Sequence, residues 1–206
     1  MSDINGKKQP QAVNFINLIN KLPDEDYLLS LIAYGTAPTI REEKPSSLMT
    51  FTRADRNLYE LWDNFGSRVC KRLKLEYICL RDTKDSVRVL FYKSRLLEEC
   101  LNKKSNREFL SKMGYSSTIT LEECIDKLRE RFECVCPHEI GIFLGIPLED
   151  VIGFINHKGE NCLLCKYWKV YHSPDRALIL FSNFDKARQD IRDAITNNSF
   201  DFTVPA

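Results

Sequence analysis

The sequence predicts a helix-rich α+β fold in which several helices cover a small, mainly antiparallel sheet of about three strands. Apolar residues recur at helical spacing through much of the chain, whereas only short runs are rich in β-branched and aromatic residues. Two of these runs are neighbours, joined by a short polar connection that is typical of a hairpin. Both faces of the two runs carry apolar side chains, so we expect helices to cover the sheet.

Three segments predict helices in the first third of the chain. Apolar residues recur at helical spacing from Ala12 to Ile19. After Pro23, the acidic residues 24–26 suit the positive N-terminal end of a helix dipole, and Gly35 can end that helix. Between residues 54 and 73 the apolar positions follow a three-four rhythm, which predicts an amphipathic helix.

Strands are predicted at two neighbouring runs, Leu75–Leu80 and Val87–Tyr92, which favour a hairpin. We expect Tyr167–Tyr171 to form the third strand. Residues 36–50 contain two prolines followed by serines, which indicates a loop with a short extended piece near Leu48–Thr52.

The remaining helices are expected at residues 94–101, 107–113 and 121–132, as two short pieces within residues 137–157, and as a final helix that begins at Pro174 and carries an apolar stripe as far as Ile195. Thr120 followed by Glu123 has the spacing of a capping box at the start of one of these helices. A turn at residues 145–147 separates the two short pieces. Ser173 is the expected N-cap of the last helix.

Composition restricts the class of protein. Residues 1–10 are polar and are expected to form a flexible tail, and residues 11–206 a single α+β domain. The formal net charge of +1 argues against a generic attraction to nucleic acid or to an anionic membrane. No apolar run approaches the ~20 residues of a membrane-spanning helix, and the N-terminus lacks a secretory signal, so we expect a cytoplasmic protein. Its eight cysteines are then expected to remain thiols.

Cysteines and histidines in the second half of the chain suggest a metal site. Cys162 and Cys165 have the C-x-x-C spacing of zinc and iron–sulfur ligands, whereas Cys134-x-Cys136 is tighter than usual. Cysteines that simply fill the core are the alternative interpretation. The candidate ligands for zinc or iron are Cys134, Cys136, Cys162, Cys165, His138 and His157.

Cys136 is also a candidate nucleophile, a candidate redox sensor or, as part of a Cys-Pro pair, a candidate axial thiolate ligand of haem. Pro137 suits the first turn of a helix, which would place Cys136 at or near the N-cap, where the helix dipole favours a thiolate. His138 lies near it in sequence. A buried structural thiol is the alternative, because no catalytic triad is recognisable.

Residues 139–157 have the helix, glycine-containing turn and second helix of a helix-turn-helix. A second helix that reads DNA supplies basic and amide side chains, but this one offers Glu149, Asp150, Gly153 and Phe154. A structural corner is therefore favoured over DNA binding.

Three segments carry a family resemblance: residues 137–155, residues 165–171 and, more weakly, residues 91–97. They resemble the signatures of domain-of-unknown-function family 3793, a bacterial family found mainly in clostridia and their relatives. The resemblance covers most of the chain and implies the cytoplasm of an anaerobic bacterium, which agrees with abundant free thiols. It implies no reaction, and it requires Cys165 more firmly than Cys134, Cys136 or Cys162.

Polar and reactive side chains inside these segments are the candidate functional residues. They could converge on a pocket between the sheet and the helical corner. In a second interpretation His138 and Glu139 only cap a helix, with Glu139 reaching back to the backbone near Cys136. The candidates are His138, Glu139, Cys165, Trp168, Lys169, Tyr171 and Arg95.

The leading hypothesis is a non-enzymatic binding or regulatory protein that recognises a small ligand, a metal or a protein partner. The alternative is a thiol- or metal-dependent enzyme that uses Cys136 or Cys165 with His138. Convergence of His138 with either thiol in an open pocket would favour the enzyme, and thiols buried separately among aliphatic side chains would favour the binding protein. DNA binding through residues 139–157 would require a basic surface beside that corner.

Overall fold

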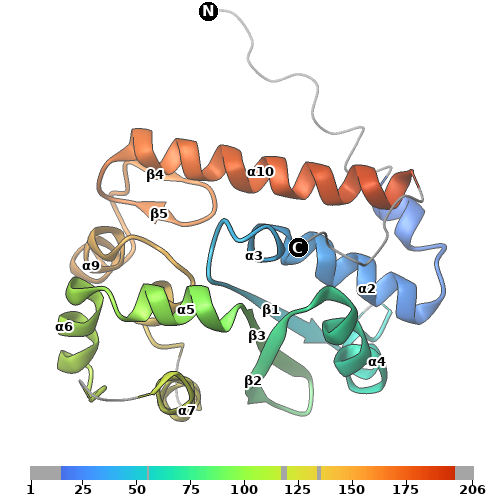
Figure 1. Ribbon diagram of the computed structural model, residues 1–206, viewed down its shortest axis with the longest axis horizontal. Coiled ribbons are helices and arrows are strands. Elements are labelled where there is room, and N and C mark those ends of the chain that lie inside the picture. Colours follow the sequence, from blue (N-terminus) through green and yellow to red (C-terminus); the bar gives the residue numbers. More distant parts are fainter. Residues whose placement is uncertain (1–14, 55, 117–119, 134–135, 198–206) are drawn as a thin grey trace, which may run out of the picture.

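The computed structural model describes residues 15–54, 56–116, 120–133 and 136–197. It confirms the predicted fold class, because a three-stranded antiparallel sheet lies among many helices (Figure 1). Residues 1–10, which are expected to form a tail, lie outside the described residues. Residues 15–19 are helical, as the spacing from Ala12 to Ile19 predicts.

Most of the predicted helices are present. The helices are α2 (Asp24–Gly35), α3 (Ala37–Ile40), α4 (Leu58–Leu73), α5 (Ser94–Leu101), α6 (Lys104–Lys112), α7 (Leu121–Phe132), α8 (Ile140–Phe143), α9 (Leu148–Asn156) and α10 (Pro174–Thr196). Thr120 and Glu123 form the predicted capping box of α7. Ser173 is the N-cap of α10, but its hydroxyl contacts the His172 ring nitrogen instead of capping the helix.

The main sheet separates two hydrophobic cores. The strands are β1 (Ser46–Thr52), β2 (Glu76–Asp82) and β3 (Ser86–Tyr92), and they lie in the order β1-β3-β2 with antiparallel pairing throughout. Alternate residues of β3 face opposite sides of the sheet. Val89 and Phe91 enter a core shared with α2, α4 and α10, whereas Leu90 enters a core shared with α5, α7 and α8. Helices therefore cover both faces, as the apolar strands predict.

The third strand is not where the sequence predicts it. The extended piece expected near Leu48–Thr52 is the full edge strand β1, which pairs with β3 along its whole length. Tyr167–Tyr171 contributes only β5 (Lys169–Val170), which pairs with β4 (Leu164–Cys165) in a separate hairpin. The rings of Tyr167 and Trp168 pack on α10 instead of entering the sheet, with Trp168 lying 4.5 Å from Phe181 between ring centroids.

Helix α10 spans the molecule and connects its two ends (Figure 1). Ala187, Ile191 and Ile195 pack into the core beside α2, and Ala177 and Phe181 pack under the β4–β5 hairpin. The hairpin is therefore held in place by a helix that is itself anchored in the main core. Within the described residues, no helix has the length and apolar character needed to cross a membrane.

Candidate functional site

The predicted corner consists of α8 and α9, joined by a turn at residues 144–147. Gly145 has a φ of +75°, and a Cβ added there would lie 2.5 Å from Pro45 Cδ. The Ser46 hydroxyl, at the start of β1, donates a hydrogen bond of 2.7 Å to the Phe143 carbonyl at the end of α8. The corner is thus fixed directly on the edge strand of the main sheet.

Asp150 joins this corner to the β4–β5 hairpin. It is 1% exposed and lies in the first turn of α9, where the helix dipole favours a negative charge. Its Oδ1 accepts hydrogen bonds from the backbone N–H groups of Tyr171 (2.7 Å) and His172 (2.9 Å). Its Oδ2 accepts one from the indole N–H of Trp168 (2.8 Å). The sequence marks Asp150 only as an acidic residue of a first helical turn, and nothing in it indicates these three bonds.

Tyr171 packs tightly against α9. A Cβ added to Gly153 would overlap the Cβ and the ring of Tyr171. On its other flank the ring lies parallel to the imidazole of His157, with 5.4 Å between ring centroids and an interplanar angle of 5°. Gly153 and His157 therefore position the hairpin on α9 together with Asp150.

A pocket of about 460 Å³ opens between the corner and the hairpin. His138, Trp168 and Lys169, which are candidates from the sequence, line it together with Cys136. Its remaining walls are mainly apolar and come from Pro137, Ile140, Gly141, Leu144, Ile146, Val151 and Phe154, with Asp150 beneath Trp168. The family-like segments 137–155 and 165–171 thus meet at one cavity.

The polar groups of the pocket are few and partly engaged. The His138 ring is exposed and packs on Phe154, with 5.6 Å between ring centroids. Lys169 Nζ donates a hydrogen bond of 2.6 Å to the Gly159 carbonyl. Trp168 presents its ring to the pocket, because its indole N–H is bound to Asp150. A ligand would therefore meet aromatic and aliphatic surface with one imidazole and one ammonium near it.

Glu139 does not line this pocket. It is 1% exposed, and its carboxylate pairs with the Arg131 guanidinium of α7 and accepts a hydrogen bond of 3.3 Å from the Tyr115 hydroxyl. Burial, together with the negative charge of Glu139, raises the pKa of Tyr115. Glu139 is the N-cap residue of α8, but the suggestion that its side chain reaches back to cap the helix is wrong, because that side chain makes no capping hydrogen bond. Its buried ion pair ties the corner to α7.

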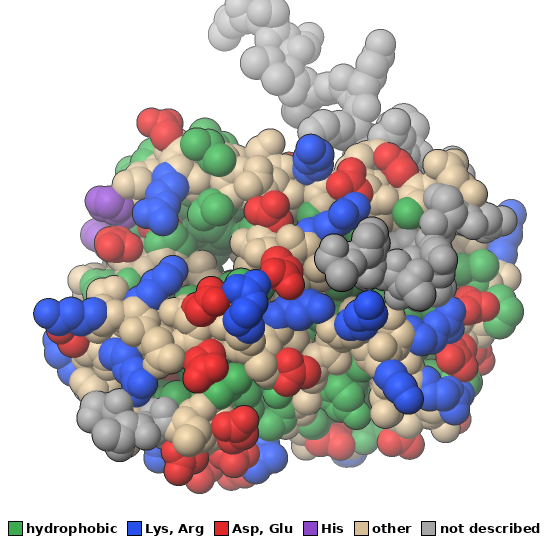
Figure 2. Space-filling model, in the orientation of Figure 1, with side chains coloured by type: hydrophobic (Ala, Val, Ile, Leu, Met, Phe, Trp, Pro, Cys, Tyr) green, Lys and Arg blue, Asp and Glu red, His purple; other side chains and the backbone are tan. Residues whose placement is uncertain are grey.

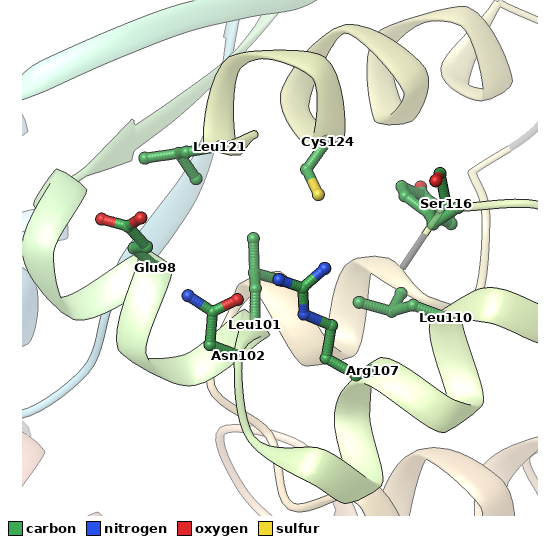
Figure 3. Close-up of a pocket in the computed structure, with 9 residues that line it drawn as sticks. Glu98, Leu101, Asn102, Arg107, Leu110, Ser116, Leu121 and Cys124 are labelled. Carbon is green, nitrogen blue, oxygen red and sulfur yellow. The ribbon is translucent and has the colours of Figure 1, made fainter. Parts of the chain in front are cut away.

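A smaller cavity lies among α5, α6 and α7 (Figure 3). Arg107 and Cys124 point into it from different helices. Burial raises the pKa of the Cys124 thiol, and the positive charge of Arg107 offsets this only in part. The volume is about 50 Å³, which is room for one or two water molecules and too little for a larger ligand.

Residues 32–201 match a family model with the description "Protein of unknown function (DUF3793)". The chain belongs to this family. The match confirms the predicted family and includes every wall of the 460 Å³ pocket, from Cys136 to Lys169. No curated protein and no solved structure matches the chain.

The other candidate residues of this family member lie outside the pocket. Cys165 is exposed on β4 and does not line it. Arg95 is exposed on α5, where it pairs with Glu42 at 2.7 Å and with Glu99 at 2.8 Å. Tyr171 packs on α9, and its hydroxyl is buried without a hydrogen-bond partner among the described residues. The structure therefore brings three of the seven candidates to one cavity and distributes the others around it.

The proposed metal ligands are only partly described. Cys134 lies outside the described residues. Within the part of the chain that the structure describes, no three histidine, cysteine or acidic side chains lie close enough together to hold a metal ion. Cys162 and Cys165 both raise the pKa of Tyr171, after the larger effect of burial, so the C-x-x-C pair lies near that ring. His157 stacks on the same ring, whereas Cys136 and His138 face the pocket.

Cys136 does not occupy the helix N-cap that the sequence predicts. Residues 138–139 form a turn instead, closed by the Ile140 N–H on the Pro137 carbonyl at 3.2 Å, and α8 begins at Ile140 with Glu139 as its N-cap. Cys136 therefore lies outside the reach of a helix dipole that would favour its thiolate. Although Cys136 is exposed as a residue, partial desolvation of its thiol raises the pKa of that thiol, so the protonated form prevails at neutral pH.

Proposed function

We propose that this protein binds a small, mainly apolar ligand in the pocket between the corner and the β4–β5 hairpin, as a cytoplasmic binding or regulatory protein and not as a catalyst. One observation carries the proposal: the two segments with family-like signatures converge on a cavity of about 460 Å³. That volume falls within the range of small-molecule sites, roughly 300–1,000 Å³.

The lining defines the chemical class of the ligand. Trp168 and Phe154 provide aromatic surface, and Ile146 and Val151 provide aliphatic surface. The His138 imidazole at the rim can hydrogen-bond to a single polar group of the ligand. We therefore expect an aromatic or branched compound that carries one hydrogen-bonding or anionic substituent.

The test is a fluorescence titration of the full chain with indole, benzoate and anilinonaphthalene sulfonate. Trp168 is one of only two tryptophans, and the other, Trp62, stacks on Phe51 in the main core. Binding in the pocket should change the emission of Trp168 in a saturable manner. Phe154→Ala should raise the dissociation constant about 5- to 30-fold, since a lost aromatic contact costs about 1–2 kcal/mol.

Ile179→Ala is the matched control, because Ile179 is an exposed apolar side chain on α10 that does not line the pocket. It should leave the affinity unchanged. If no probe binds in a saturable manner, or if both variants weaken binding equally, the pocket is not the ligand site.

One observation favours a second candidate function, a thiol-dependent activity. Cys136 and His138 line the same open pocket, which is the arrangement expected of a thiol and its base. Two observations oppose it: burial raises the pKa of Cys136, and the described residues include no hydrogen bond between its Sγ and the His138 ring. The measurement that separates the two functions is the reactivity of Cys136, considered below.

DNA binding through residues 139–157 is not proposed. The exposed residues of α9 include Glu149, Ile152 and Phe154, which do not neutralise phosphates. Asp150, the other acidic residue of its first turn, is committed to the hairpin.

A further inference from the structure

A second large cavity, of about 420 Å³, lies between α5, α10 and the turn of the corner. In Figure 2 the surface is hollowed between α10 and α5, with charged and apolar side chains around the hollow. Residues 42–45 form one wall of this groove, and Leu96, Ile146 and Phe184 are among its apolar members. It is separate from the proposed ligand pocket, although Ile146 lines both.

Lys44 lines this groove from a rigid segment of backbone. Its own N–H donates a hydrogen bond to the Pro38 carbonyl of α3 at 3.3 Å. The next carbonyl, of Pro45, accepts a hydrogen bond of 3.1 Å from the Lys93 N–H. Gly145 packs directly against Pro45 from the other side. The root of the Lys44 side chain is thus held between α3, the main sheet and the corner.

The Lys44 ammonium is half-buried and has no counter-charge in contact with it. Among the described residues it forms neither a hydrogen bond nor an ion pair, and its Nζ lies over the Phe184 ring, 5.8 Å from the ring centroid. The adjacent carboxylates are engaged elsewhere. Glu42 pairs with Arg95 at 2.7 Å, and Glu43 accepts a hydrogen bond of 3.1 Å from Asn183.

A second cation, Arg188, further disfavours the charged form of the Lys44 amine. Arg188 of α10 lies over the rings of Tyr167 (4.8 Å) and Tyr34 (5.5 Å), and it forms no ion pair among the described residues. Burial, and after it the charge of Arg188, lower the pKa of Lys44 to about 8. At pH 7 about a tenth of this amine is then neutral, against less than about a thousandth for an exposed lysine.

We infer that Lys44 is a nucleophilic lysine, and that the groove takes a small polar aldehyde or ketone that condenses with it to an imine. The inference rests on the unpaired, half-buried amine in a cavity large enough for such a compound. The other charged residues of the groove favour a polar substrate over an apolar one, and they are Glu42, Glu43, Glu99, Lys103, Glu149 and Arg176. This site does not depend on the function proposed for the other pocket.

The condensation balances without an oxidant or a reductant. The lone pair of neutral Nζ attacks the carbonyl carbon, and a C–N bond forms while the carbonyl π electrons move to oxygen. A proton passes from nitrogen to that oxygen to give a carbinolamine. The C–O bond then breaks, nitrogen loses its remaining proton, and one water molecule leaves. Carboxylates that line the same groove can carry these protons.

The experiment is reductive trapping on the full chain. Pyruvate and glycolaldehyde are the probes, each at limiting concentration with sodium cyanoborohydride at pH 7, and peptide mass mapping locates the label. We expect label on Lys44 at least about tenfold faster than on the exposed lysines Lys71 and Lys186. Lys44→Arg should abolish the fast label, and Lys71→Arg, the matched control, should leave it intact.

A second measurement uses no substituted protein, so a folding defect in Lys44→Arg cannot affect it. Competitive acetylation of the unmodified protein at a series of pH values should give Lys44 a midpoint near pH 8, well below the ordinary range of an exposed lysine. Label on Lys44 that is no faster than on exposed lysines overturns the inference. Rapid acetylation of Lys44 with no trapping of either carbonyl probe overturns it as well, because the amine would be reactive but no imine would form.

Discussion

The carboxylate of Asp150 accepts the indole N–H of Trp168 at 2.8 Å, and this bond joins α9 to the β4–β5 hairpin across the floor of the pocket. The same carboxylate holds two backbone N–H groups that lead into α10. One buried side chain therefore fixes both the wall that carries Trp168 and the entry to the longest described helix.

Asp150→Ala should destabilise the protein by about 3 kcal/mol, because it leaves three donors without their charged acceptor. Urea unfolding followed by circular dichroism measures the change, and the emission of Trp168 should shift in the folded state. Glu149→Ala is the control, since Glu149 is the exposed neighbour on the same helical turn and should change stability by no more than about 0.5 kcal/mol. Equal effects of the two substitutions would show that the Asp150 bonds contribute little.

Local signals predict most of the helices, but they indicate only a short extended piece where the edge strand β1 lies. The segment before β1 has prolines and serines that indicate a loop, yet Ser46 and Ser47 are buried in β1. The Ser46 hydroxyl is satisfied by the Phe143 carbonyl at 2.7 Å, far along the chain, and the Ser47 hydroxyl by the Thr39 hydroxyl of α3 at 2.8 Å. Such partners convert a loop-like sequence into a strand, and they are visible only once the fold is known.

The sequence predicts the residues of the candidate site only in part. His138, Trp168 and Lys169 belong to the motif-like segments that the sequence indicates, and all three line one pocket. Asp150 and Lys44 were not found, because their importance comes from burial and from neighbours on other elements. The spacing of residues along the chain indicates neither the burial of a side chain nor its neighbours on other elements.

Gly153→Ala should destabilise the protein by about 1–3 kcal/mol. The new methyl group would overlap Tyr171, which is confined by the parallel ring of His157 on its other flank. Thermal unfolding checks the prediction, with Ile152→Ala as a control at an exposed position of the same helix. A stable Gly153→Ala protein would mean that the hairpin can move away from α9, and the pocket would then be wider than described.

The reactivity of Cys136 separates binding from thiol chemistry. Because burial raises its pKa, Cys136 should react with iodoacetamide slowly at pH 7 and much faster at pH 9. Mass mapping should show exposed Cys165 labelled before buried Cys70 and Cys124. His138→Ala should leave the rate at Cys136 unchanged. Rapid labelling at pH 7 that is lost in His138→Ala would instead establish an activated thiol and favour the enzyme.

The buried Cys70 thiol makes the stability of the fold decrease at alkaline pH. It is 1% exposed beside the main sheet, and burial raises its pKa from 9.0 to about 12. Both states keep the thiol proton below pH 9, so this contribution to stability is then fully present. Between pH 9 and about pH 12 the unfolded chain loses the proton while the folded chain keeps it, and stability falls by about 1.4 kcal/mol per pH unit.

Cys70→Ala removes this dependence but also leaves a small cavity. The parent's free energy of unfolding minus that of Cys70→Ala should therefore fall by about 1.4 kcal/mol between pH 8 and pH 10. Urea unfolding at each pH measures this difference. Cys165→Ala serves as the control, since that side chain is exposed in the folded state and should leave the pH profile of the parent unchanged. Parallel pH profiles for the parent and Cys70→Ala would show that the thiol ionises as readily in the folded core as in the unfolded chain. We do not expect this result, because the thiol is enclosed between α4 and the sheet, where a charge is costly to bury.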